Sequence, residues 1–432
     1  MSFQQGLSGL NVASTALDNI GNNVANSGTV GFKSSTTEFA DVFAASLAGA
    51  GAAPIGLGAK VATVAQQFTQ GNITSTSNAL DLAINGSGFY RLQTATGDIV
   101  YSRNGQFQLN KDGYIVNASG QELMGYAADV NGNVNPPLTP LRMFDPTLSS
   151  DSAPQATGTS TAGTGVQANL NLDSRLAQPT VGTFNYANAQ SYNNSTAVTV
   201  YDSLGNPHIM TLYFAKTATT NVWNVYATVS NPAGATPTFT DLSAGGTTRL
   251  TQITFNPDGS IASGGTPTIT ITPGQLGYAG GVNQMTNVPV NFTGTTQYGS
   301  AFTVNSLIQD GFASGKLAGF NISNDGTILG NYTNGQSKNL GQVILANFRD
   351  PQGLQPLGNN VWAATAAAGT ELDGAPGSSG QFGPIQSSAL EDSNVDLTAE
   401  LVNMITEQRA YQANAQTIKT QDNILQTLVN LQ

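Results

Sequence analysis

The segment from residue 397 to the C-terminus repeats an apolar side chain every seventh position, and this pattern constrains the fold most. One seam position holds Leu397, Met404, Tyr411, Ile418 and Leu425. The other holds Leu401, Ala415 and Val429, with Gln408 and Asp422 between them. Two apolar positions per seven residues are typical of a coiled coil, whereas a helix on a globular core has a wider stripe. Such a helix needs a partner to bury its seam.

The N-terminal segment offers that partner. Its predicted packing residues are Leu7, Leu10, Leu17, Ile20 and Val24. Leu10, Leu17 and Val24 repeat by seven, and Leu7, Ser14 and Gly21 form a smaller second set. We therefore predict that residues 1–30 pair with residues 395–432. The C-terminal helix is predicted to begin near Ser393. Each glycine disfavours a helix by about 1 kcal/mol relative to alanine, so Gly6, Gly9 and Gly21 weaken the N-terminal helix. Because weak helices need packing to form, we expect the terminal helices to become ordered on assembly. Packing of each helix on its own domain is the alternative.

Composition excludes several classes of function. The net charge is −11, and the 14 Lys and Arg residues form no basic patch, which argues against nucleic-acid binding. The chain has no cysteine, which excludes disulfides, thiolate chemistry and Cys-ligated metals. No apolar run approaches the roughly 20 residues of a membrane span, so we predict no membrane insertion. Residues 1–10 carry no positive charge and no continuous apolar run, so export would proceed without a cleaved signal peptide.

Between the ends, we predict mainly β-domains nested between the terminal helices, an α+β multidomain fold. Residues 31–70 and 387–394 are the predicted connector, flexible or extended because glycines interrupt residues 48–58. Residues 71–145 with 300–386 form a predicted inner β-domain, and residues 146–299 an outer one. Asp-Gly pairs at 112–113, 258–259 and 325–326 predict tight turns. Alternating runs predict outer strands at residues 197–201, 208–214, 222–229, 250–255 and 268–271.

The sequence offers no catalytic constellation. His208 is the only histidine, and it starts an alternating run that reads as a strand, so a Ser/His/Asp triad is not expected. Residues 129–133 resemble the opening of a calcium loop, but the glycine and glutamate that such a loop requires are missing. Nothing points to a particular carboxylate pair of the kind that glycosidases use. We predict no enzymatic activity, no cofactor and no metal.

Both ends of the chain resemble the signatures of the bacterial flagellar rod and hook protein family. The N-terminal match covers residues 9–11, 17–26 and 29–33, including Asn22, Asn23, Ala25, Asn26, Gly31, Phe32 and Lys33. The C-terminal match covers residues 394–405 and 408–418. Residues 101–107, 112–117 and 360–365 also match. Together these motifs cover most of the chain outside residues 146–299.

Within this family, a long middle segment is typical of hook members, and residues 201–208 resemble their outer domain. Distal rod members largely lack that segment, although long-rod proteins carry insertions near residues 48–58. The resemblance implies a homo-polymer with a coiled-coil inner layer that acts as a flexible joint. It also implies contacts with the flagellar rod, hook cap, hook–filament junction proteins and export apparatus, and an extracellular location. A distal rod protein is the first alternative; an unrelated extracellular β-rich enzyme or binding protein is the second.

Overall fold

A computed structural model describes residues 2–42, 56–129, 132–145, 152–160, 164–231, 238–242, 249–278, 281–378 and 380–430. The chain divides into two compact units. The first comprises Met1–Thr147, Gly319–Asn331 and Ser337–Gln432, and the second comprises Leu148–Ala318 and Tyr332–Gln336. The described part is mostly β, with one long helix near each terminus.

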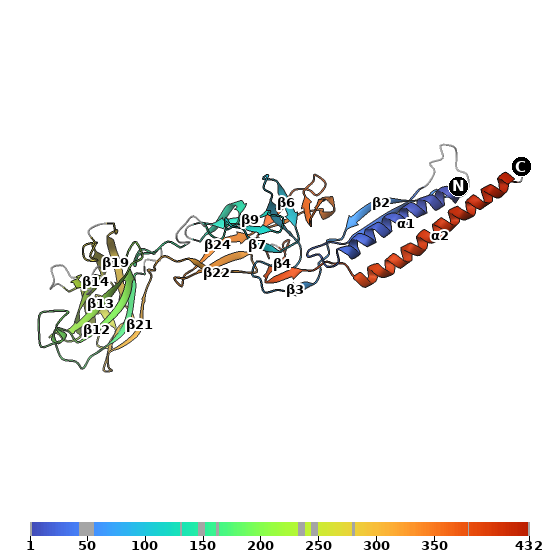
Figure 1. The fold of residues 1–432 in the computed structure, drawn as a ribbon. Coiled ribbons are helices and arrows are strands. Elements are labelled where there is room, and N and C mark those ends of the chain that lie inside the picture. The colour runs from blue at the N-terminus through green and yellow to red at the C-terminus, as the bar shows by residue number, and fades with distance from the viewer. Residues whose placement is uncertain are drawn as a thin grey trace. The chain divides into compact units, whose positions relative to one another are not determined.

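The two terminal helices are antiparallel neighbours in the first unit. Helix α1 spans Ser2–Ala25 and helix α2 spans Leu397–Asn430. Gly6 faces Ile418, whereas Asn23, later in α1, bonds Glu400 near the start of α2. Figure 1 shows the helices side by side, with both chain termini at the same end of the pair.

Helix α2 begins later than the sequence prediction near Ser393. The Asp396 carboxylate accepts hydrogen bonds from the backbone N–H groups of Thr398 and Ala399, at 2.9 and 3.1 Å. These bonds satisfy N–H groups that have no partner within the helix, so Asp396 is the N-cap.

A β-hairpin follows α1, where the sequence predicts a flexible or extended connector. Strands β1 (Ser35–Val42) and β2 (Gly58–Gln66) pair antiparallel from Ser35 with Gln66 to Val42 with Gly58, and both contact α1. Residues 35–42 and 58–66 of the connector therefore form a paired sheet, because their β-branched residues find cross-strand partners. Residues 43–55, which include most of the Gly/Ala-rich segment, lie outside the described residues.

The remaining strands of the first unit form one large sheet and two small ones. The main path of the large sheet is β22 (Leu317–Ile322), β23 (Thr327–Tyr332), β24 (Ser337–Val343), β9 (Glu122–Ala128), β5 (Phe89–Gln93), β6 (Ile99–Ser102), β27 (Val361–Ala363) and β26 (Gln355–Gly358). Pairing beside this path are β7 (Phe107–Leu109), β8 (Ile115–Asn117), β10 (Val134–Pro140), β25 (Leu345–Asn347) and β28 (Leu372–Gly374). The small sheets pair β4 (Leu82–Ile84) with β29 (Ile385–Ser387), and β3 (Ile73–Ser75) with β30 (Ala389–Glu391). A short 3₁₀ helix, η2, spans Pro351–Gly353.

An aromatic core stabilises this unit. Phe89 makes edge-to-face contacts with Phe68, Phe348 and Trp362, at centroid distances of 5.5–6.2 Å. Such pairs add about 0.5–1.5 kcal/mol each beyond the burial of apolar area. Because Phe68 follows the β1–β2 hairpin directly, its ring anchors that end of the hairpin to the sheet.

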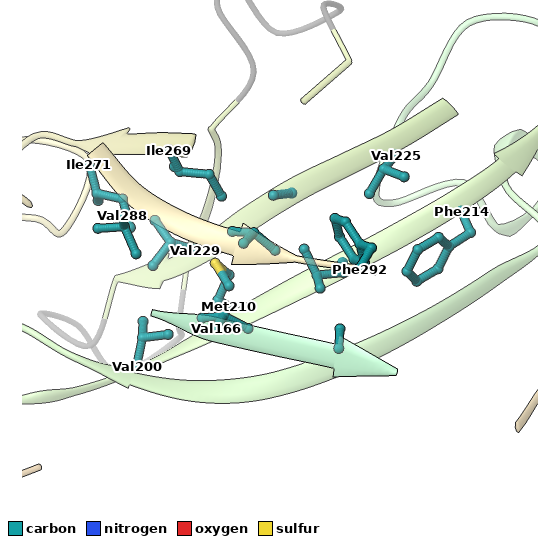
Figure 2. Close-up of a cluster of buried hydrophobic side chains, with 14 of the residues drawn as sticks. Val166, Val200, Met210, Phe214, Val225, Val229, Ile269, Ile271, Val288 and Phe292 are labelled. Atoms are coloured by element: carbon teal, nitrogen blue, oxygen red, sulfur yellow. The ribbon is translucent and has the colours of Figure 1, made fainter. Parts of the chain in front are cut away.

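Two sheets share the core of the second unit. The first contains β18 (Thr268–Ile271), β19 (Met285–Asn291), β11 (Val166–Asp173), β20 (Thr296–Tyr298) and β21 (Thr303–Gln309). The second contains β12 (Asn194–Tyr201), β13 (Pro207–Lys216), β14 (Val222–Asn231), β15 (Thr238–Asp241), β16 (Thr251–Phe255) and β17 (Ile261–Ser263). Figure 2 shows Val166, Val288 and Phe292 from the first sheet side and Phe214, Val225 and Val229 from the second gathered in one cluster. The 3₁₀ helix η1 spans Ala189–Ser191.

The predicted tight turns and outer strands are confirmed. Gly113, Gly259 and Gly326 have φ of +84°, +86° and +80°, values that glycine adopts without strain. Each glycine lies in a turn between neighbouring strands, and all five predicted outer runs overlap observed strands.

The outer domain does not end at residue 299, where the sequence analysis placed its boundary. Strand β21 (Thr303–Gln309) pairs antiparallel with β11, from Val166 with Gln309 to Asn171 with Thr303. This long-range pairing holds residues 303–309 in the second unit, which extends to Ala318.

Candidate assembly surfaces

Small residues form the seam of α1 that faces inward. Gly6, Ala13, Ala16, Ile20 and Asn23 are buried, and their spacings of seven, three, four and three residues are those of a coiled-coil seam. A Cβ added at Gly6 would lie 3.1 Å from Ile418, and one added at Gly9 would lie 2.7 Å from the Asn414 side chain. The glycines that weaken α1 intrinsically therefore permit its close contact with α2.

The N-terminal residues predicted to pack occupy three different environments. Ile20 is buried, and Leu10, Leu17 and Val24 are half-buried. Leu7 is 44 % exposed, as is the neighbouring Phe3 at 46 %. Most of the predicted leucine stripe thus lies beside the intramolecular seam, because the close approach of the helices favours smaller side chains there.

The C-terminal residues predicted to pack also differ in their exposure. Met404, Ala415 and Ile418 are half-buried, whereas Leu397, Leu401, Tyr411 and Leu425 are exposed. Side chains are described only as far as residue 427 in α2, so that of Val429 lies outside the described part. Val402, Ile405 and Ile424, which were not predicted, are also exposed apolar residues. The helix pair of one copy consequently leaves many large apolar side chains uncovered.

The inward seam of α2 contains a polar repeat that the sequence analysis missed. Glu400, Glu407, Asn414 and Gln421 recur every seven residues and are all half-buried. Asn23 donates a hydrogen bond to Glu400 at 3.1 Å. These positions are polar and so add nothing to an apolar repeat, although their heptad spacing is visible in the sequence.

The asparagines of the N-terminal signature connect α1 to the hairpin. Asn23 accepts a hydrogen bond from the Ser35 N–H and donates one to the Ser35 carbonyl, both at 2.9 Å. Asn26 donates to the Asn22 carbonyl at 3.0 Å, which stabilises the end of the helix. Ala25 is the last residue of α1 and is exposed, and the half-buried Phe32 follows in the turn region.

Lys33 belongs to a buried ion cluster. Its Nζ lies 2.7 Å from Glu391 Oε1 and also donates to the Thr69 carbonyl at 2.7 Å. Arg103 Nη1 lies 3.4 Å from Glu391 Oε2, and Arg103 Nη2 donates to the Gly86 carbonyl at 2.8 Å. One carboxylate therefore joins the segment after α1, the β5–β6 region and the last strand before α2.

Burial opposes charge in this cluster. Desolvation lowers the pKa of Lys33 and of Arg103 from their ordinary values, while attraction to Glu391 acts in the opposite direction. Both cations retain hydrogen-bonded oxygen partners, which is the arrangement that makes a buried charge tolerable.

Gly31 brings the chain close enough to form this cluster. Its φ is +69°, and an added Cβ would lie 2.7 Å from the backbone of Arg103. The Gly31 N–H also donates to the Glu391 carbonyl at 2.8 Å. The signature residues Gly31 and Lys33 thus act together on Glu391, a partner that the sequence analysis did not identify.

His208 has structural partners in the second unit. Its Nδ1 lies 3.1 Å from the Ser230 carbonyl oxygen, and its Nε2 lies 3.3 Å from Asp202 Oδ2. Asp202 also accepts from the backbone N–H groups of Leu204 and Asn206, closing the turn before β13. Both side chains are buried, so the histidine serves this turn.

Within the described ranges, no group of three or more His, Cys, Asp or Glu side chains could hold a metal ion. Of the helices that the structure describes, none is long and apolar enough to cross a membrane.

Four family models match successive parts of the chain. They are the flagella basal body rod protein at residues 3–33, the FlgE/F/G hook protein D1 domain at 83–147, the basal body protein FlaE D2 domain at 171–312 and the basal body rod FlgEFG protein C-terminal region at 386–431. The chain is thus of the class of flagellar basal body rod and hook proteins.

Relatives that match over the whole chain show which family within this class it belongs to. The chain is 44 % identical to flagellar hook protein FlgE of Salmonella typhimurium over 438 residues, and 44 % identical to that of Escherichia coli over 434 residues. In both comparisons the match covers 100 % of this chain and 100 % of the relative. The protein of the same name from Borreliella burgdorferi is 33 % identical over 100 % of this chain and 99 % of that one. The chain belongs to the flagellar hook protein family.

Proposed function

We propose that this chain is the structural subunit of the bacterial flagellar hook, a self-assembling tube that transmits torque from rod to filament while it bends. The observation that carries this proposal is the set of exposed apolar residues on the terminal helices, which include Leu7, Leu401, Ile405 and Leu425. Large exposed apolar patches mark interaction sites, and a helix pair that leaves heptad positions uncovered can bury them against further copies.

In this proposal the α1–α2 pair forms an inner coiled-coil layer of the polymer. The sheets of the first unit and the two-sheet second unit form outer layers. The flagellar rod, hook cap, junction proteins and export apparatus are the proposed partners, and the assembled hook lies outside the cell. Its role is mechanical rather than enzymatic.

The low charge of the chain supports a compliant tube. Only 9 % of residues are charged, whereas about a quarter is usual. Neutral polar side chains exchange hydrogen bonds with water at little net cost, so outer surfaces can slide past each other. Adding complementary Lys/Glu pairs to the second unit should stiffen the hook; unchanged bending stiffness would contradict this mechanism.

Assembly of purified full-length chain tests the central proposal. The wild type should form tubes visible by electron microscopy, and Leu401→Ser together with Leu425→Ser should raise the critical concentration at least about tenfold, which corresponds to 1.4 kcal/mol. Gln412→Ser, an exposed polar position of α2, is the matched control and should assemble normally. Curved tubes support a hook, straight rigid tubes would instead indicate a rod protein, and a permanently monomeric wild type would overturn both.

A further inference from the structure

A groove in the first unit lies between α1, β1 and α2. Ala16, Ile20 and Phe39 contribute apolar atoms to its lining, and the Phe39 side chain is 47 % exposed. Glu400 and Glu407 contribute carboxylates from α2. Glu400 already accepts a hydrogen bond from Asn23. Glu407 has no hydrogen bond or ion pair with any residue that the structure describes. The groove therefore combines an apolar floor with an acidic edge.

The opposite face of α2 carries complementary chemistry. The groove-lining residues Glu400, Asn403 and Glu407 lie on one side of the helix, and at 100° per residue Leu401, Ile405 and Arg409 lie on the other. Leu401 is 45 % exposed and Ile405 is 52 % exposed. Arg409 is also exposed, and it follows Ile405 by one turn.

Among the residues of the two terminal helices, Arg409 is the cation best suited to the acidic edge of the groove. Helix α1 contains no Lys or Arg, and α2 contains only Arg409 and Lys419. Lys419 follows Tyr411 and Ala415 on its own row of the helix, and Ala415 is half-buried. Both residues that precede Arg409 on its row, Leu401 and Ile405, are exposed and free to contact another copy. An Arg guanidinium can form a bidentate pair with a carboxylate while its neighbours bury apolar area.

We infer that the groove of one copy receives the Leu401–Ile405–Arg409 face of a second copy, with Arg409 paired to Glu407. The inference rests on the proposed function and adds the contact by which copies join. Because groove and inserted face lie on opposite sides of the same helix, each copy has one of each. Such a heterologous contact repeats without closing unless its rotation forms a ring, so it generates an open helical polymer.

Charge reversal tests the inference in full-length protein. Glu407→Lys alone places two cations together at every contact, and Arg409→Glu alone places two anions together. Each single variant should raise the critical concentration for tube formation at least about tenfold. The two positions are two residues apart on one helix and do not face each other, so the effect is intermolecular.

Rescue provides the decisive result. The double variant Glu407→Lys with Arg409→Glu should assemble within about threefold of the wild-type critical concentration. An equimolar mixture of the two single variants should also assemble, because each groove then meets a face of opposite charge. Combining Glu407→Lys with Lys419→Glu is the matched control and should not rescue assembly.

Two outcomes overturn the inference while leaving the proposed function intact. These are normal assembly of both single variants, or assembly of the wild type without rescue in the double variant and the mixture. Far-UV circular dichroism of each monomeric variant checks that the helices are retained. Failure of the wild type to form any polymer would instead contradict the proposed function itself.

Discussion

Lys33 and Glu391 form an ion pair of 2.7 Å in which both side chains are excluded from solvent, although 358 residues separate them in the chain. Lys33 follows α1, and Glu391 ends the last strand before α2. The pair therefore closes the first unit at the point where the chain enters and leaves its β-structure. Removing one partner leaves the other charge buried and unpaired, which lowers the stability of the fold strongly.

Lys33→Met should destabilise the first unit by about 3–5 kcal/mol, because Glu391 then retains only the longer 3.4 Å ion pair with Arg103 and the neutral Gly71 N–H donor at 2.9 Å. The chain has two tryptophans, Trp362 in the first unit and Trp223 in the second. In a Trp223→Phe background, Trp362 fluorescence during urea unfolding reports the first unit alone. Lys111→Met, at a side chain that is 90 % exposed, is the control and should change the unfolding free energy by less than about 0.5 kcal/mol. Equal effects of both substitutions would contradict the role of the pair.

Gly31→Ala should also destabilise the first unit, for a steric reason. A non-glycine residue at φ +69° costs on the order of 1–3 kcal/mol, and the added Cβ would lie 2.7 Å from backbone atoms that hold Arg103. Gly21→Ala is the matched comparison, because no atom lies within 4 Å of its added Cβ in the described structure. That substitution should increase helicity by far-UV circular dichroism, with a gain of up to about 1 kcal/mol. Similar effects at the two glycines would show that close approach does not explain Gly31.

Sequence periodicity predicted the helices better than the faces that they bury. A heptad of large apolar residues identified both helices, but the intramolecular seam of α1 consists mainly of Gly6, Ala13 and Ala16. Small residues give a weak apolar signal, and their importance depends on how closely the partner approaches. The leucine stripe remained visible because it is more hydrophobic, yet much of it lies outside that seam.

Long-range pairing explains the remaining differences. Glu391 looks like an ordinary charged residue in the sequence, because neither Lys33 nor Arg103 is near it in the chain. Strand β21 likewise carries no local signal of its pairing with β11, so the domain boundary was placed too early. Turn residues with positive φ were predicted correctly, since Asp-Gly pairs specify their conformation locally.

Glu371 should make the first unit less stable as the pH rises from about 4.5 to about 7. Burial, together with neighbouring Asp373, raises the pKa of Glu371 to about 7, while Arg91 at 3.1 Å opposes the shift. Below pH 4.5 the carboxyl is protonated in both folded and unfolded chains and contributes no pH dependence. Between the two pKa values the unfolded chain releases its proton more readily, so unfolding becomes easier.

Glu371→Gln removes this titration and tests the assignment. The unfolding free energy of the variant minus that of the wild type should increase by about 2 kcal/mol between pH 4 and pH 8, allowing for partial solvent exposure. Urea unfolding followed by Trp362 fluorescence in the Trp223→Phe background measures this difference. A difference that is constant across the pH range would rule out a raised pKa for Glu371.

Phe214→Ala should destabilise the second unit while leaving the first unit unchanged. Phe214 is fully buried, and its ring meets that of Phe292 edge to face at 6.0 Å (Figure 2). Truncating a buried phenylalanine costs about 3–5 kcal/mol through lost burial and the cavity left behind. Because each unit has its own core, Trp223 fluorescence in a Trp362→Phe background should show the loss, and Trp362 in the Trp223→Phe background should not. Ile209→Ala, at a 48 % exposed position on the same strand, should cost less than about 1 kcal/mol. If Trp362 reported the same loss as Trp223, the two units would unfold as one, and separate cores would not describe the stability of this chain.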